Sequence, residues 1–303
     1  MSADGCAPLV ITGATGFIGQ QVVRLLRDHG ARRVTMLGRH AGTEPLPDGW
    51  THVQVDLTRD PVPDGIMPGS TVLHLAASTG KAAPAVMRRT NVDGTARLVD
   101  AARTHGARGF VFVSSIAAGY TDRRWYAYAE SKRDAEAIVS AAGIPYSIVR
   151  PTMGFGPGSP VQRGLSLLAQ LPVPVLFGDG RVMVQPIDVL DVARLLVGLG
   201  VASGQANRVL EAGGADRLTM RDLMAELRRA RGLDPRAPLH LPLLAFRMAL
   251  GAVEPLARPV LPLTAGQLAA FANDSMARPD PLLDALMPAP RRLADLLGAA
   301  GDA

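Results

Sequence analysis

Tyr128 and Lys132 stand four residues apart, and their types and spacing are suited to acid–base chemistry. Residues four apart on a helix share one face, so a helix here would direct both side chains into the same cleft. A free tyrosine has a pKa of about 10, and a nearby ammonium favours the phenolate. We therefore expect Lys132 to lower the pKa of Tyr128, so that the phenol can exchange a proton with a carbonyl or alcohol oxygen.

The lysine is informative because this chain uses arginine almost everywhere. Of its 32 lysines and arginines, only Lys81 and Lys132 are lysines. Arginine would replace Lys132 poorly, because its larger planar group cannot present a compact charge to a phenol and a ribose together. Tyr126 is the rival tyrosine, but the residue four positions after it is Glu130. The spacing therefore favours Tyr128 as the acid–base residue.

Ser115 is predicted to complete this catalytic set. It follows "GFVFVS" (109–114), which has the pattern of a buried strand. Ligands of open α/β sheets bind at the carboxyl ends of the strands. The Ser115 hydroxyl would then hydrogen-bond a substrate oxygen and polarise it.

A glycine loop near the N-terminus predicts a dinucleotide site. Gly13, Gly16 and Gly19 form G-x-x-G-x-x-G between a predicted strand at 8–12 and a predicted helix ending near His29. Glycine triplets also occur in loops that bind nothing, but this one follows a strand and opens a helix. That context favours a pyrophosphate bound by the free N–H groups of the helix N-terminus.

The end of the second predicted strand bears on the choice of nicotinamide. An acid there would bind the ribose 2′-OH of NAD. Gly38 stands in its place, followed by Arg39, whose guanidinium suits a 2′-phosphate. We expect NADP(H) rather than NAD(H); the alternative is an ordinary surface arginine. Asp56, after the third strand, is predicted either to accept from the adenine amine or to be an exposed loop acid.

Strands and helices alternate through the first half of the chain, which predicts a parallel, doubly wound sheet. Further strands are predicted at 32–37, 51–55, 70–76, 109–114 and 145–150, with helices at 91–104 and 126–142. After residue 150 come loops rich in Gly and Pro, a helix near 188–199, a strand at 207–213, a helix at 219–232 and about seventy helical, apolar residues. We expect an α/β, Rossmann-type domain over 1–175 and a smaller, mostly helical substrate lobe over 176–303, interleaved with it.

Composition narrows the class of protein. The chain has 303 residues, 48% hydrophobic and 19% charged, with a net charge of +5. Its arginines are scattered among acids, which argues against nucleic-acid binding. A single cysteine, Cys6, fits a reducing compartment. The six histidines lack metal-ligand spacing, and no G-x-S-x-G element for hydrolysis occurs.

The N-terminus has no signal-peptide pattern, and no apolar run has transmembrane length. A cytoplasmic protein is expected, with peripheral membrane contact left open. "LLAFRMALGAVEPLAR" (243–258) predicts a largely apolar helix on which Arg247, Gly251, Glu254 and Arg258 form a narrow stripe. This helix packs the lobe, or it forms an apolar lid or a membrane-facing surface.

Taken together, these motifs resemble the short-chain dehydrogenase/reductase superfamily in its extended or atypical branch, often called NAD-dependent epimerase/dehydratase-like. The resemblance covers nearly the whole chain. It rests on "ITGATGFIG" (11–19), "HLAA" (74–77), "NVDGT" (91–95), "FVFVSS" (110–115), "YAESK" (128–132), "RPTMGFGPG" (150–158) and "QPIDVLDVA" (185–193).

The resemblance implies a Rossmann fold, a nicotinamide cofactor, and Ser115, Tyr128 and Lys132 as the catalytic set, with Lys132 also binding the nicotinamide ribose. It implies that the residues after "RP" lie near the nicotinamide. Asn91 matches an asparagine of a helix kink or proton relay; a plain helix N-cap would look the same. A homodimer is an implication of resemblance alone. The residues it assigns to the cofactor are Gly13, Thr15, Gly16, Phe17, Ile18, Gly19, Arg39, Asp56, Leu57, Ala76, Asn91, Lys132 and Pro151.

Two departures from the family pattern bear on the substrate. Sugar 4,6-dehydratases carry an acidic pair after the catalytic hydroxyl residue, whereas Ile116 and Ala117 follow Ser115. Where nucleotide-sugar enzymes often carry an arginine for the diphosphate, the chain has Val184. Arg181 and Arg163 are the candidates to compensate.

Three functions follow. The favoured one is an NADPH-dependent carbonyl reductase, or the reverse alcohol dehydrogenase, on a largely apolar small molecule. The second is an epimerase that oxidises and re-reduces its substrate. The third is a sensor or assembly protein that binds the cofactor without turnover.

Overall fold

The central element of the structure, a computed structural model, is a seven-stranded sheet in which every strand pair is parallel. The described residues are 7–40, 42, 45–63, 68–202, 204–257, 261 and 263–298, so Cys6 and Arg258 lie outside them. In spatial order the strands are β11 (Arg208–Ala212), β6 (Tyr146–Pro151), β5 (Gly109–Val113), β4 (Thr71–His74), β1 (Leu9–Thr12), β2 (Val34–Gly38) and β3 (Trp50–Gln54).

The strand order reverses between β1 and β4, and this gap is where open α/β sheets bind ligands. The strands β1, β4 and β5 are buried along their whole length. Strands covered on both faces are continuous apolar runs, as "GFVFV" illustrates for β5. The expected Rossmann-type α/β sheet is therefore confirmed.

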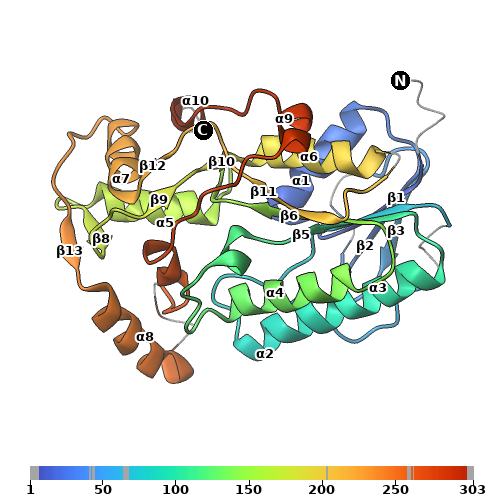
Figure 1. Ribbon diagram of the computed structural model, residues 1–303, viewed down its shortest axis with the longest axis horizontal. Helices are drawn as coiled ribbons and strands as arrows, with labels where there is room; N and C mark the ends of the chain where they lie inside the picture. Colours follow the sequence, from blue (N-terminus) through green and yellow to red (C-terminus); the bar gives the residue numbers. More distant parts are fainter. Residues whose placement is uncertain are drawn as a thin grey trace.

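Helices cover both faces of the sheet (Figure 1). On one face α1 (Phe17–Asp28) and α6 (Val189–Val201) share a core with β1 and β4. On the other face α3 (Gly94–Thr104) and α4 (Ala127–Ser140) pack through Leu98, Val99 and Ala135. A short helix, α2 (Pro84–Met87), and a π-helical turn, η2 (Arg88–Asp93), lead into α3. The residues predicted to be catalytic therefore lie where α4 meets the sheet, two of them on α4 and Ser115 after β5.

A second, smaller core lies beyond the carboxyl ends of the strands. Its apolar residues come from helices α5 (Pro160–Gln170), α7 (Met220–Arg229) and α10 (Leu293–Gly298), the 3-10 helix η4 (Gln267–Phe271), and strands β7 (Gly154–Phe155), β8 (Val175–Phe177) and β9 (Met183–Val184). Short ladders pair β7 with β10 (Ile187–Asp188), β9 with β12 (Leu218–Thr219), and β8 with β13 (Leu239–Leu241). Helix α8 (Leu243–Ala257) follows β13, and α9 (Pro281–Leu286) packs on α6.

The chain crosses between the two cores more than once. The expected boundary between the two domains lies at residue 175. Helix α5 lies before this boundary but belongs to the second core, whereas α6 and β11 lie after it and pack with the central sheet. The last seventy residues are helical only in part: α9 and α10 have 6 residues each, with Pro288 and Pro290 between them. Proline lacks the N–H that a continuing helix needs, which explains the interruption. Among the described residues, no helix is both long and apolar enough to cross a bilayer.

Candidate active site

The glycine loop lies between β1 and α1, and its shape requires glycine at two positions. Gly13 has a φ of 72°, and a Cβ there would lie 2.5 Å from the backbone nitrogen of Ala76. A Cβ at Gly19 would lie 2.0 Å from the carbonyl oxygen of Gly13. The loop is therefore folded tightly against the end of β4, as close approach to a pyrophosphate requires.

The N-terminus of α1 is built to receive an anion. Gly16 is its N-cap and has no side chain to cap the first turn. Thr15 and Gly16 are exposed, while Phe17 and Ile18 are half-buried. The Phe17 ring would lie 3.3 Å from a Cβ added to Gly154, so the glycine loop contacts the segment after Pro151, at the end of β6. These residues fit a dinucleotide bound across the gap between β1 and β4.

The residues expected at the adenosine end lie where the sequence predicts them. Arg39 is exposed directly after β2. The Asp56 carboxylate accepts hydrogen bonds from the backbone nitrogen and the hydroxyl of Thr58 at 3.0 and 2.7 Å. These bonds, the backbone one first, lower the pKa of Asp56, and the Arg59 and Arg39 charges lower it further. Asp56 therefore closes its own loop through Oδ1, while its Oδ2 lies 3.5 Å from Nε of the exposed Arg59 and would have to share that contact with an adenine.

Two more predicted cofactor residues have structural partners. Leu57 is buried, and its carbonyl accepts from Nη1 of Arg97 at 2.8 Å. The backbone nitrogen of Ala76 donates to Oγ1 of Thr12 at 3.2 Å. Oγ1 of Thr12 also lies 2.6 Å from Nδ1 of His74, whose burial lowers its pKa to about 3. His74 is therefore a neutral core residue rather than an acid or base.

Ser115 and Tyr128 come together at the carboxyl end of β5. Ser115 stands two residues after β5, and Tyr128 lies in the first turn of α4. The Ser115 hydroxyl lowers the pKa of Tyr128, but burial is the larger effect and raises it to about 12. The structure thus pairs the two predicted residues, while the pKa of Tyr128 moves opposite to our expectation.

Lys132 lies one turn further along α4 and is 2% exposed. Its Nζ donates to the carbonyl of Val113 at 2.7 Å and lies 4.7 Å from the centre of the Phe112 ring. Burial lowers the pKa of Lys132 to about 7, against the smaller raising effect of Glu136. The amine therefore points toward the end of β5. The pKa of Tyr128 is shifted mainly by burial, which raises it, and not by this lysine.

Asn91 joins helix α4 to the loop after β4. It lies inside the π-helical turn η2, whereas the N-cap of α3 is Asp93, so the plain N-cap interpretation is wrong. Oδ1 of Asn91 accepts from the Ser78 nitrogen at 2.7 Å, and Nδ2 donates to the Ser78 carbonyl and to Oγ of Ser131, both at 2.9 Å. Ser131 in turn donates to the carbonyl of Tyr128 at 2.8 Å.

A buried ion network behind α4 was missed by the sequence reasoning. Glu136 accepts from Nε and Nη2 of Arg150 at 2.8 and 2.6 Å and from the hydroxyl of Ser114 at 2.5 Å. Arg150 also reaches Glu211 at 3.4 Å. The only signal in the sequence is that Glu136 stands four residues after Lys132, on the same helix face.

Around Gln185, polar groups are used in contacts within the protein. Gln185 is buried, donates to the Gly214 carbonyl at 2.7 Å, and accepts from the Ala277 nitrogen at 3.0 Å. The hydroxyl of Thr152 donates to the Gln185 carbonyl. Val184 is buried, and both Arg163 and Arg181 are exposed. Within the part of the chain that the structure describes, no cluster of His, Cys, Asp and Glu is arranged to hold a metal.

Comparison with known proteins agrees with this geometry. The family model "NAD dependent epimerase/dehydratase family" matches residues 9–213. A ceramide reductase of Caulobacter vibrioides is 37% identical over 205 residues, which are 65% of this chain and 62% of that protein. A dTDP-glucose 4,6-dehydratase of Streptomyces antibioticus is 30% identical over 74% of this chain and 77% of its own.

Solved structures extend the likeness in fold to almost the whole chain. The crystal structure of gox2253 has a TM-score of 0.75 at 24% identity and covers 97% of both chains. MoeE5 in complex with UDP-glucuronic acid and NAD has a TM-score of 0.71 at 23% identity over 96% of both. The matched family model spans the glycine loop, helix α4 and every strand of the sheet. The chain therefore belongs to the NAD-dependent epimerase/dehydratase family.

Proposed function

We propose that the protein is an NADPH-dependent carbonyl reductase, acting in reverse as an alcohol dehydrogenase, on a largely apolar small molecule. The observation that carries this proposal is the placement of Ser115 and Tyr128 together at the carboxyl end of β5. Carbonyl reduction needs a proton donor at the substrate oxygen, and a phenol is in its donor form at neutral pH.

Each of the three residues has a distinct task in this reaction. A bound nicotinamide cofactor would supply the hydride for the carbonyl carbon. The Ser115 hydroxyl would hydrogen-bond the carbonyl oxygen and hold it beside the phenol. Tyr128 would give its proton to that oxygen as the alcohol forms. Lys132, already at the end of β5, would hold the nicotinamide ribose and place positive charge near the phenolate that results.

Loss of the Tyr128 hydroxyl tests the proposal. NADPH oxidation would be followed with a panel of apolar ketones and aldehydes, in the native protein, Tyr128→Phe and Tyr126→Phe. Removing the proton donor should lower kcat about 10²–10⁴-fold and leave NADPH binding unchanged. Tyr126 is the matched control, because its ring lies 5.9 Å from that of Tyr128 without belonging to the catalytic set. Retained turnover in Tyr128→Phe would refute the assignment.

The preference for NADPH is assigned to Arg39, which is exposed after β2 where an acid would mark NAD. A charge-assisted hydrogen bond to a 2′-phosphate contributes roughly 1.5–3 kcal/mol, so Arg39→Ser should weaken NADPH binding about 10–100-fold. NADH binding should not change. Arg33→Ser, another exposed arginine at the start of the same strand, is the control. Equal losses for both cofactors would show that Arg39 does not read the phosphate.

An apolar substrate is supported by the residues that stand at the position of the family arginine and by one relative. Gln185 and Val184 are buried and used in packing and backbone contacts, which leaves no arginine at the position that family resemblance gives to a diphosphate. Ceramide, the substrate class named for the Caulobacter relative, is a lipid. The match covers 62% of that relative, so a lipid substrate is proposed for this chain on this likeness.

An epimerase that oxidises and re-reduces its substrate is the second candidate, because Tyr128, beside Ser115, could take the proton of a substrate hydroxyl during oxidation and return it to the same oxygen during re-reduction. MoeE5, which resembles this chain in fold, holds a nucleotide sugar. The two functions separate in the same assay, since an epimerase consumes no cofactor over a complete turnover. A cofactor-binding sensor would bind NADPH and show no difference between native protein and Tyr128→Phe. Cytoplasmic location and a homodimer stay predictions.

A further inference from the structure

Helix α8 carries its charged side chains inward and its apolar side chains outward. Its two charged residues, Arg247 and Glu254, are 2% and 5% exposed. The exposed positions from 242 to 256 are all apolar: Pro242, Leu244, Ala245, Phe246, Met248, Ala249, Ala252, Val253, Pro255 and Leu256. Leu256 is 92% exposed. A surface helix normally shows the reverse arrangement, so the outward face of α8 calls for a partner.

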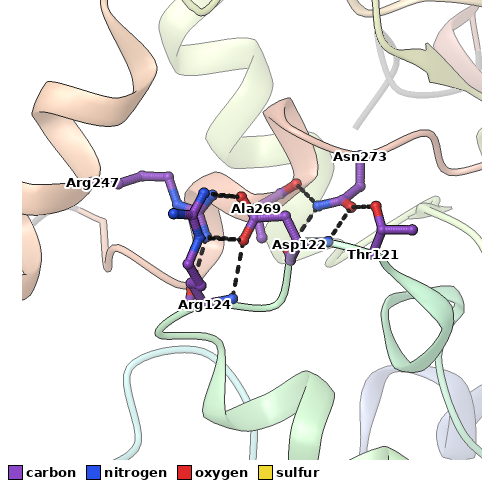
Figure 2. A network of polar contacts seen from close by, with 6 residues as sticks. All are labelled: Thr121, Asp122, Arg124, Arg247, Ala269 and Asn273. Carbon is purple, nitrogen blue, oxygen red and sulfur yellow. Dashed lines mark hydrogen bonds and ion pairs between the residues drawn. The ribbon is translucent and has the colours of Figure 1, made fainter.

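Polar contacts fix this orientation (Figure 2). Nη1 of Arg247 donates to Oδ2 of Asp122 at 2.7 Å, and Nη2 donates to the Arg124 carbonyl at 2.7 Å. Asp122 is itself held, because its nitrogen donates to Oδ1 of Asn273 at 3.0 Å. On the next turns, the Glu254 carboxylate accepts from the backbone nitrogen of Ala265. Rotating the apolar face inward would break these buried contacts and leave charges unpaired.

The composition of the face argues against a stable protein partner. Protein interfaces have a polar rim with hydrogen bonds, whereas the exposed positions from 242 to 256 carry no polar side chain. A lipid surface needs no such hydrogen bonds.

The surroundings of α8 offer a tryptophan and an arginine to a lipid headgroup region. Trp125 is 49% exposed, and a Cβ on Gly251 of α8 would lie 3.9 Å from its ring. Tryptophan is enriched at the level of lipid headgroups. The Arg124 guanidinium lies 5.9 Å from the Trp125 ring; its side chain is 64% exposed and pairs with Asp122 at 3.0 Å. The chain as a whole carries a net charge of +5, which is complementary to anionic headgroups.

We propose that α8 is a membrane-docking helix whose outward face enters the headgroup region of an anionic bilayer. The helix stays on the protein through Arg247 and Glu254 while Leu244, Met248, Val253 and Leu256 face the acyl chains. Docking of this kind needs no spanning segment, because an amphipathic helix lies in the plane of the interface.

Docking here would place the bilayer beside the catalytic helix. Asp122 and Arg124, which hold Arg247, stand just before Tyr126, the N-cap of α4. A lipid ketone could therefore pass from the bilayer to Tyr128 without crossing water. This route rests on the proposed function, whereas the docking itself does not.

Vesicle binding tests the proposal with the full-length protein. Co-sedimentation would use phosphatidylcholine vesicles with and without phosphatidylglycerol, for the native protein and for the double variant Met248→Glu/Leu256→Glu. We expect the native protein to bind the anionic vesicles, with weaker binding in high salt, and the variant to lose at least about tenfold in partitioning because its new charges would have to enter the interface. The control is Val209→Glu, an exposed apolar position on the edge strand β11.

A second readout follows Trp125 directly. Its emission should shift to shorter wavelength on vesicle binding, and this shift should vanish in Trp125→Phe, which retains only the buried Trp50. Absence of vesicle binding by the native protein, or equal binding by the double variant, would overturn the proposal. So would a native dimer that the same variant converts to monomer without a change in vesicle binding. Vesicle binding is measured without turnover, so its result would still test the docking proposal if the reductase proposal failed.

Discussion

At the scale of single residues, burial decides the protonation states in the candidate active site. It raises the pKa of Tyr128 to about 12 and lowers that of Lys132 to about 7. The phenol is protonated at neutral pH, as an ordinary tyrosine also is, and the raised pKa makes it a weaker acid until a cofactor or substrate adds charge nearby. The pKa of Lys132 lies close to neutral pH, so without cofactor the amine is only partly charged there. A cofactor phosphate or ribose would give the charged amine a further partner and raise its pKa.

Lys132 should make the stability of the cofactor-free protein depend on pH. Its folded pKa of about 7 lies below the ordinary value of 10.5, so the unfolded chain binds the extra proton between these limits. Stability should therefore rise as the pH rises from about 7 to about 10, and the lysine should destabilise the fold most at or below pH 7. Lys132→Met should accordingly raise the melting temperature more at pH 7 than at pH 9.5.

The chain offers a matched control for this measurement, because its other lysine, Lys81, is exposed. Lys81→Met should change the melting temperature little, and by the same amount at both pH values. A gain for Lys132→Met that does not shrink toward pH 9.5 would show that the burial of this charge is not the cause.

At the scale of elements, α4 is fixed to the sheet from behind. Glu136 on α4 meets Arg150 on β6, with side chains 8% and 18% exposed. Breaking a buried ion pair by removing one charge costs about 3–5 kcal/mol, because the other charge is left without its partner. Glu211 still reaches Arg150, so the lower end of this range applies.

Glu136→Gln should therefore lower the free energy of unfolding by about 3 kcal/mol, as measured by urea denaturation. Glu130→Gln is the comparison on the same helix, since Glu130 is 50% exposed in its pair with Arg123. Exposed pairs contribute about 1 kcal/mol or less. Equal losses in the two variants would mean that the buried network does not hold α4.

At the scale of the whole molecule, the two cores form one interleaved body. Helix α6 and strand β11 return the chain to the sheet after it has entered the second core. Tyr120 contacts Ser275 through their hydroxyls, and Thr152 contacts Gln185, which links segments far apart in the chain. With so many crossings, neither core is expected to unfold alone.

The two tryptophans allow this to be measured. Trp50 is buried beside β2, where its indole nitrogen donates to the Ala31 carbonyl at 2.6 Å, and Trp125 adjoins α8. In Trp125→Phe and Trp50→Phe, the urea midpoint from fluorescence should coincide with that from far-UV circular dichroism of the same variant. A fluorescence midpoint for Trp125 that precedes the circular dichroism midpoint would indicate independent melting of the second core.

The amino-acid sequence by itself determined the parts that depend on local spacing. Alternation of buried strands with helices predicted the parallel sheet, and the seven strands lie within a few residues of their expected ranges. The glycine loop was identifiable because glycine alone tolerates the close approach of Ala76 and Gly13 backbone atoms. The pairing of Tyr128 with Ser115 followed from one helix face and one strand end.

Only the tertiary structure decided which way several side chains turn, because their partners lie far away in the chain. Lys132 meets the Val113 carbonyl, and Arg150 meets Glu211 across 61 positions. Arg247 meets Asp122 across 125 positions. The sequence shows a narrow polar stripe on α8, and amphipathic patterning alone would place that stripe in water. Folding places it inside, since the half-buried Asp122 carboxylate is available to Arg247 there, and so leaves the apolar face exposed.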